Sequence, residues 1–123
     1  MEEYDPLQAP NAKEWLELDE GDQILLVKDY HTARKIEVPN IDVHAAIHAT
    51  VETQLASSDP PQTGRALARM LTEGLDRHDA VHAIGSVLAE LMFDLMKEAP
   101  SGDPNEAYSA SLDRLTAESW RSI

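Results

Sequence analysis

The segment DRHDAVHAIGSVLAELMFDLMK, residues 76–97, is the most hydrophobic periodic stretch of the chain. Its apolar residues recur at intervals of three and four, which is the pattern of an α-helix with one buried face. Asp76 at its start and Asp79 three residues later match a variant of the helix-capping box. A helix of this length needs other elements to cover its apolar face, so the segment predicts a helical core.

The rest of the chain shows the same helical periodicity and no convincing pair of strands. We therefore predict an all-α fold, a compact bundle of four to five helices whose sequence neighbours are mostly antiparallel. Residues 1–18 are expected to form an acidic extended arm and a short turn that buries Trp15, while residues 19–123 form the single bundle domain. The other predicted helices cover approximately 20–34, 41–56, 62–73 and 104–115, after capping residues or prolines and separated by breaks rich in Pro, Ser and Gly.

The composition limits the classes of partner. A formal net charge of −13, a pI near 4.5 and scattered basic residues argue against nucleic acid and against an anionic membrane surface. The chain has no cysteine, which excludes disulfides and thiolate metal sites. The N-terminus lacks the features of a signal peptide, and no apolar stretch is long enough to span a bilayer. These observations predict a cytoplasmic protein.

The pattern H-x-A-[I/V]-H-A occurs twice, at residues 44–49 and 78–83, and holds four of the five histidines. The spacing of four places His44 and His48 on one helical face, and likewise His78 and His82. Both pairs lie in the first turns of their predicted helices. If consecutive helices are antiparallel, these two helices are parallel, and all four imidazoles lie at one height in the bundle. Helix N-termini also favour neutral imidazole, the form that binds metals.

Few carboxylates lie near enough along the chain to join these histidines as metal ligands. Glu52 follows His48 by four residues and is within reach, whereas Glu90 follows His82 by eight, or about 12 Å along the helix axis. We therefore predict the ligands His44, His48, His78 and His82 with Glu52, and we exclude Glu90. His31 ends the first long helix, and the sequence does not place it relative to the others. Such an imidazole-rich site suits Zn, Fe, Ni or Cu, with Zn or Fe expected first, rather than Mg or Ca.

The alternative is a metal-free protein with histidines packed in its core. Such a protein would serve as an interaction or homodimerisation module, and its low aromatic content and modest size make a homodimer plausible. Metal analysis separates the two. Geometry can exclude the metal site, because four imidazoles with nitrogens more than about 6 Å apart could not share an ion whose bonds are about 2 Å long. No catalytic triad or glycine-rich phosphate loop occurs, so the sequence predicts no reaction and leaves catalysis undecided.

A resemblance supports this reading of the fold. The residues that carry the resemblance are Asn40-Ile41-Asp42-Val43-His44, His48, Gln54-Leu55, Pro60-Pro61, His78-Asp79-Ala80-Val81-His82 and Leu88-Ala89-Glu90. From Pro39 to Leu115 the chain resembles a family of small bacterial all-helical proteins of uncharacterised function. Members of that family look like three elements in order: an H-x3-H helix that begins at an asparagine, a spacer helix, and a second H-x3-H helix that ends in L-A-E. The resemblance implies an all-helical fold and no known activity.

Overall fold

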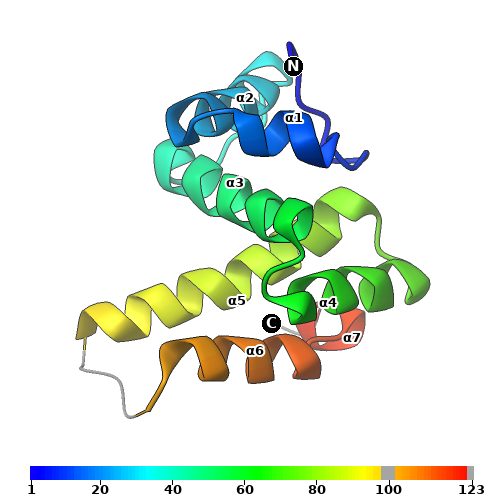
Figure 1. Cartoon of the computed structure of the whole chain (residues 1–123), viewed down its shortest axis with the longest axis vertical. Coiled ribbons are helices and arrows are strands. Elements are labelled where there is room, and N and C mark those ends of the chain that lie inside the picture. Colours follow the sequence, from blue (N-terminus) through cyan, green and yellow to red (C-terminus); the bar gives the residue numbers. More distant parts are fainter. Residues whose placement is uncertain (98–101, 122–123) are drawn as a thin grey trace.

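The computed structural model describes residues 1–97 and 102–121 and is all-α, as predicted. Its helices are α1 (Ala12–Glu17), α2 (Glu20–Ala33), α3 (Ile41–Ser57), α4 (Pro61–Thr72), α5 (Arg77–Lys97), α6 (Pro104–Arg114) and α7 (Ala117–Arg121) (Figure 1). These described residues thus contain seven helices rather than four or five. The two additional helices, α1 and α7, are short. The first of them, α1, forms where the sequence predicted a short turn around Trp15.

Most helices begin at the predicted capping residues. The side chains of Asn11, Asp19 and Asn40 accept hydrogen bonds from the backbone N–H groups three residues later. Asp76 accepts from the N–H of Asp79 in the same way, over 2.8 Å. These bonds satisfy backbone donors that have no partner inside the helix, which explains why the predicted starts agree with the structure.

The helices form two layers that meet along α3 and α5 (Figure 1). The upper layer holds α1, α2 and α3, and the lower layer holds α4 to α7. Each layer has its own apolar core, one around Trp15 and Val27 and the other around Met70, Ile84 and Leu112. The contact between α3 and α5 is close, because a Cβ atom added at Gly85 would lie only 3.2 Å from Ile47 Cγ2.

The prediction that α3 and α5 are parallel is wrong. Three contacts join them in opposite order, since His44 neighbours His82, His48 neighbours His78, and Glu52 pairs with Arg77. The two helices also run in opposing directions across Figure 1. The prediction assumed that α4 returns along α3, whereas α4 makes more of its contacts with α5 and α6 than with α3. Crossing helices of opposite direction still bring the two histidine pairs together.

Two of the first ten residues pack into the bundle. Tyr4 is 3 % exposed and belongs to the upper core, and Pro6 is fully buried, so the segment predicted as an extended arm is anchored at these two positions, while most of its other residues are exposed. Tyr4 packs against Trp15 with ring centroids 5.6 Å apart. The segment therefore positions side chains for the site described below.

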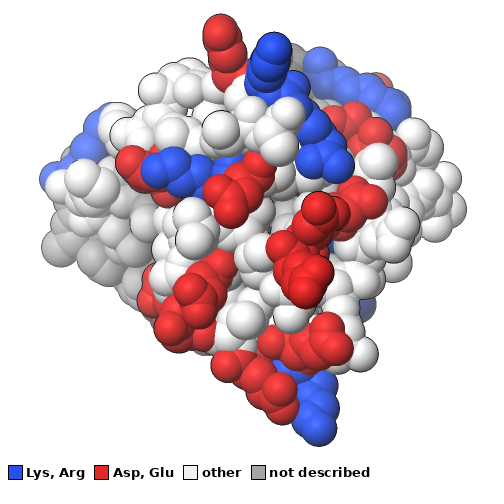
Figure 2. All heavy atoms as spheres, turned by 90° about the horizontal axis from the view of Figure 1, so that it is seen from above, with Lys and Arg blue, Asp and Glu red and all other residues white. Residues whose placement is uncertain are grey.

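The surface agrees with the acidic composition. Seen from above the upper layer, Asp and Glu side chains occur at many points of the face, with Lys and Arg between them (Figure 2). Among the described residues, no helix combines the length and the hydrophobicity needed to cross a bilayer.

Candidate metal centre

All five histidines of the chain meet where α2, α3 and α5 come together. Nine of the ten pairs of histidine rings have centroids 4.2 to 6.2 Å apart, from His78 and His82 to His31 and His82. The four members that each bring one ring nitrogen to a common point, here called the four-histidine group, are His31, His48, His78 and His82. One ring nitrogen of each member lies within 4.8 Å of that of every other member. This separation satisfies the limit of about 6 Å set from the sequence, and it exceeds the ~4.2 Å that two bonds of about 2.1 Å can span, so the rings must move closer together to share one ion.

The group includes His31, which the sequence did not place, and not His44, which was predicted as a ligand. His44 is half-buried beside the group, with its Nε2 atom 3.1 Å from His31 Nε2. A usable signal existed for His31, because it follows the buried Val27 by four residues on the stripe of α2 that faces α3. The short connector between α2 and α3 then places the end of one helix opposite the start of the other.

Hydrogen bonds determine which nitrogen of His31 carries a lone pair. Its Nδ1 atom lies 2.8 Å from the carbonyl oxygen of Val27, and a carbonyl only accepts. His31 Nδ1–H is therefore the donor, and the Nε2 atom has the lone pair. This lone pair accepts the Nε2–H of His44 when no ion is present, which gives His44 a role outside the four-histidine group.

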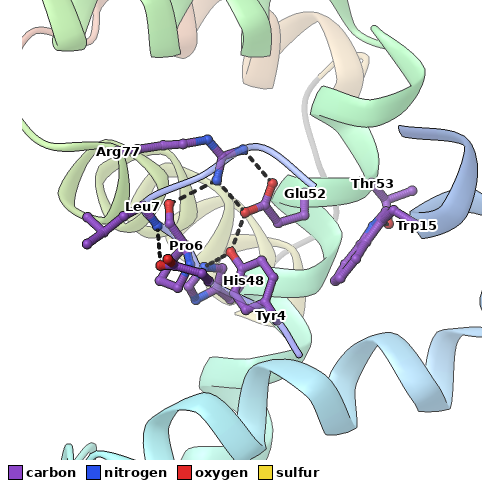
Figure 3. A network of polar contacts seen from close by, with 9 residues as sticks. Tyr4, Pro6, Leu7, Trp15, His48, Glu52, Thr53 and Arg77 are labelled. Carbon is purple, nitrogen blue, oxygen red and sulfur yellow. Dashed lines mark hydrogen bonds and ion pairs between the residues drawn. The ribbon is translucent and has the colours of Figure 1, made fainter. Parts of the chain in front are cut away.

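The same reasoning applies to His48 (Figure 3). The Tyr4 hydroxyl donates to the Glu52 carboxylate in a very short hydrogen bond. It therefore accepts from His48 Nε2–H, at an N···O distance of 2.7 Å. The lone pair of His48 is on Nδ1, and this atom is buried without a hydrogen-bond partner. His78 Nε2 and His82 Nε2 are also buried without partners. Three nitrogens of the group are thus without partners, and those of His78 and His82 offer a lone pair when the ring proton is on Nδ1.

Glu52, predicted as a ligand, has other partners in the structure. Its carboxylate forms two hydrogen bonds with the Arg77 guanidinium, of 2.7 Å and 2.8 Å, and also accepts from Tyr4 (Figure 3). The Glu52 side chain is fully buried, so a paired cation is needed to balance its charge. Glu52 therefore contacts the histidines through Tyr4, as an outer group that orients His48. Glu90 is exposed on α5, consistent with its exclusion. The sequence did not identify Tyr4 and Arg77 as residues of this site, where they bind His48 and Glu52.

Burial favours the neutral form of four histidines, His44, His48, His78 and His82. Burial, and then repulsion from the neighbouring histidines, lowers the pKa of His48 to about 2 and that of His82 to about 3. Burial also lowers the pKa of His44 and of His78. Burial and the Glu52 anion raise the pKa of Tyr4, so its phenol remains a hydrogen-bond donor. Neutral imidazoles with oriented lone pairs are the form that a metal ion requires.

We expect the metal-free protein to lose stability on mild acidification. The unfolded chain takes up protons at the histidines as the pH falls below about 6.5, while His48 and His82 stay neutral in the fold. The stabilisation from these neutral histidines is therefore fully present above about pH 6.5. Below that pH the free energy of unfolding falls by about 1.4 kcal/mol per pH unit for each such group. With a discount for the partial exposure of His82, chemical denaturation should show a loss of ~2 kcal/mol between about pH 7.5 and pH 5.5.

The control for this prediction is the double variant His48→Gln/His82→Gln, which removes the two groups with the lowest pKa values. Its unfolding free energy should change less over the same pH interval than that of the unmodified chain. The carboxylates are common to both proteins and cancel in this comparison. An equal pH dependence in both proteins would contradict the assignment of the effect to these histidines.

The donor set fits a transition-metal ion. A tetrahedral ion with bonds of about 2.0–2.1 Å holds its nitrogen ligands about 3.3–3.4 Å apart. The nitrogens of the group are within 4.8 Å of one another, so they must approach by up to about 1.5 Å to reach that spacing. Four imidazoles without a carboxylate suit Zn, Fe, Ni or Cu and do not suit Mg or Ca.

Comparison with known proteins places this site in an uncharacterised family. No curated protein and no solved structure matches the chain. A family model matches residues 10–114, which include the whole four-histidine group and leave out Tyr4. This agrees with the resemblance to an uncharacterised family noted from the sequence. The chain belongs to the family described as a domain of unknown function, DUF1841.

Proposed function

We propose that the protein binds one transition-metal ion, Zn or Fe as the first expectations, through His31, His48, His78 and His82. The observation that supports this most directly is the set of buried nitrogens without partners, His48 Nδ1, His78 Nε2 and His82 Nε2. A buried polar atom without a partner costs about 1–3 kcal/mol. An ion that accepts their lone pairs removes this penalty at all three atoms at once.

The surrounding residues support such an ion by fixing the rings. The Val27 carbonyl holds His31, and the chain Arg77–Glu52–Tyr4 holds His48, so two ligands present a lone pair before the ion arrives. Metal-bound histidines in general donate their second N–H to a carbonyl or a carboxylate system in this way. When bound, the ion would supply Lewis-acid or electron-transfer chemistry, depending on the metal.

The test is a metal titration of the untagged protein. We expect one Zn²⁺ or Co²⁺ per chain, and the Co²⁺ form should show a visible spectrum typical of nitrogen ligands. Removal of a ligand, as in His48→Ala or His82→Ala, should weaken binding more than about 100-fold, which exceeds the ~10–100-fold effect of outer groups. Glu90→Gln is the control on the same helix as His82, and it should bind the metal ion as tightly as the unmodified chain does.

The variants His31→Ala and His44→Ala decide the ligand set. Loss of binding in His31→Ala, with binding retained in His44→Ala, is expected from the four-histidine group. The opposite result would favour the ligands predicted from the sequence. The proposal would be refuted if the protein held less than one metal ion per several chains and if all variants bound added metal with equal affinity. It would favour the alternative, a metal-free interaction or homodimerisation module with structural histidines.

A further inference from the structure

A pocket of about 290 Å³ lies between α3 and α5, directly beside the histidines. His44, His48 and His82 form its inner wall. The rest of its lining consists of small or apolar residues, which are Ile47, Val81, Gly85, Ser86 and Ala89. We call this the α3–α5 pocket. Two of the buried nitrogens without partners, His48 Nδ1 and His82 Nε2, belong to residues of its wall.

The charge of the lining restricts what the pocket accepts. Its lining contains no Lys, Arg, Asp or Glu, so no side chain there balances a charge on a ligand. Burying an unpaired charge is strongly unfavourable, and the surrounding protein has a formal net charge of −13. The pocket therefore disfavours a phosphate ester or a carboxylate that lies away from the proposed ion, whereas the ion itself would balance the charge of an atom bound to it. Its polar groups are the histidine nitrogens and the exposed Ser86 hydroxyl.

The size of the pocket depends on small residues at the helix crossing. Gly85 lies opposite Ile47, where even a single Cβ atom would approach Ile47 Cγ2 to 3.2 Å. Larger side chains at Gly85 or Ala89 would fill the pocket. Its volume of about 290 Å³ is at the lower end of ligand pockets, which are typically ~300–1,000 Å³. It thus accommodates small molecules.

We propose that the α3–α5 pocket is the ligand site of the metal centre, and that it takes small molecules with one donor atom and an uncharged, apolar body. This inference rests on the proposed function, because the donor atom would bind the ion as a fifth ligand beside the four imidazoles of the four-histidine group. The apolar body would pack against Ile47 and Val81. A ligand that enters here reaches the ion past His48 and His82, which belong both to the pocket and to the group.

The experiment is a titration of the Co²⁺-loaded protein with two pyridines, followed in the visible spectrum. 4-Ethylpyridine is uncharged and apolar, whereas isonicotinate has the same ring nitrogen and a carboxylate. We expect 4-ethylpyridine to change the cobalt spectrum saturably and to bind at least tenfold more tightly than isonicotinate. Equal affinities would overturn the proposed selectivity, and the absence of a spectral change would overturn the ligand site.

The variant Gly85→Leu fills the pocket and should weaken 4-ethylpyridine binding at least tenfold while the chain still binds one Co²⁺. Gly64→Leu is the matched control, because a Cβ atom there meets nothing within 4 Å on the distant helix α4. Ala89→Leu is a second filling variant in case Gly85→Leu does not fold. Unchanged pyridine binding in a folded filling variant would overturn the location. Failure of the unmodified chain to bind Co²⁺ would refute both the proposed function and this inference, whereas cobalt binding without a pyridine response refutes the inference alone.

Discussion

Replacement of Arg77 by Met should lower the free energy of unfolding by about 3–5 kcal/mol. The Arg77 guanidinium is the cation that balances the Glu52 carboxylate, at 2.7 Å, and the Glu52 side chain has no exposed surface. Without Arg77, Glu52 becomes a buried charge whose described hydrogen-bond partner is the Tyr4 hydroxyl alone. Breaking one side of a buried ion pair is among the largest effects of single substitutions. Urea denaturation near neutral pH measures the change.

Arg65→Met is the matched control for this prediction. Arg65 pairs with Asp113 at 3.6 Å, but both side chains are about half exposed, with values of 58 % and 49 %. Such surface pairs typically contribute less than about 1 kcal/mol. The double variant Glu52→Leu/Arg77→Met removes both charges and should recover part of the lost stability. A loss in Arg77→Met no larger than that in Arg65→Met would contradict the importance of the buried pair.

The histidine cluster could be predicted in part from the sequence, because local rules govern that part. The spacing of four places His44 beside His48 and His78 beside His82 on any α-helix. The capping residues Asn40 and Asp76 determine where both helices start. These features depend on neighbours in the chain and agree with the structure.

The remaining features depend on how helices pack, which the local pattern does not determine. The parallel arrangement of α3 and α5 was predicted wrongly, because it assumed an α4 that returns along α3, and α4 contacts α5 and α6 more than α3. The opposite direction places Arg77 against Glu52 and thereby gives Glu52 a partner other than the histidines. Tyr4 lies in a segment with two prolines that has no helical periodicity, and only its burial in the fold places it beside His48.

Loading the four-histidine group with metal should stabilise the fold by ~4 kcal/mol when free metal exceeds the dissociation constant about 1,000-fold. The ion binds the folded chain, in which the group brings three helices to one point, and this arrangement is lost on unfolding. For a domain of this size the gain corresponds to a rise in Tm of roughly 10–20 °C. Thermal denaturation of chelator-treated protein, with and without added Zn²⁺, measures the shift.

The shift should depend on the ligands and on pH in a specific way. The double variant His48→Ala/His82→Ala removes two nitrogens of the group and should show almost no rise in Tm with Zn²⁺. Glu90→Gln should retain the full rise, because Glu90 is exposed on α5. Protons can compete with the metal ion for the imidazole nitrogens. Above about pH 5 this competition is weak in the folded protein, because His48 and His82 stay neutral there, and protons bind mostly to the unfolded chain. The rise in Tm should therefore persist at about pH 6. A rise of equal size in the double variant would show that Zn²⁺ stabilises the protein elsewhere, and would contradict binding at the four-histidine group.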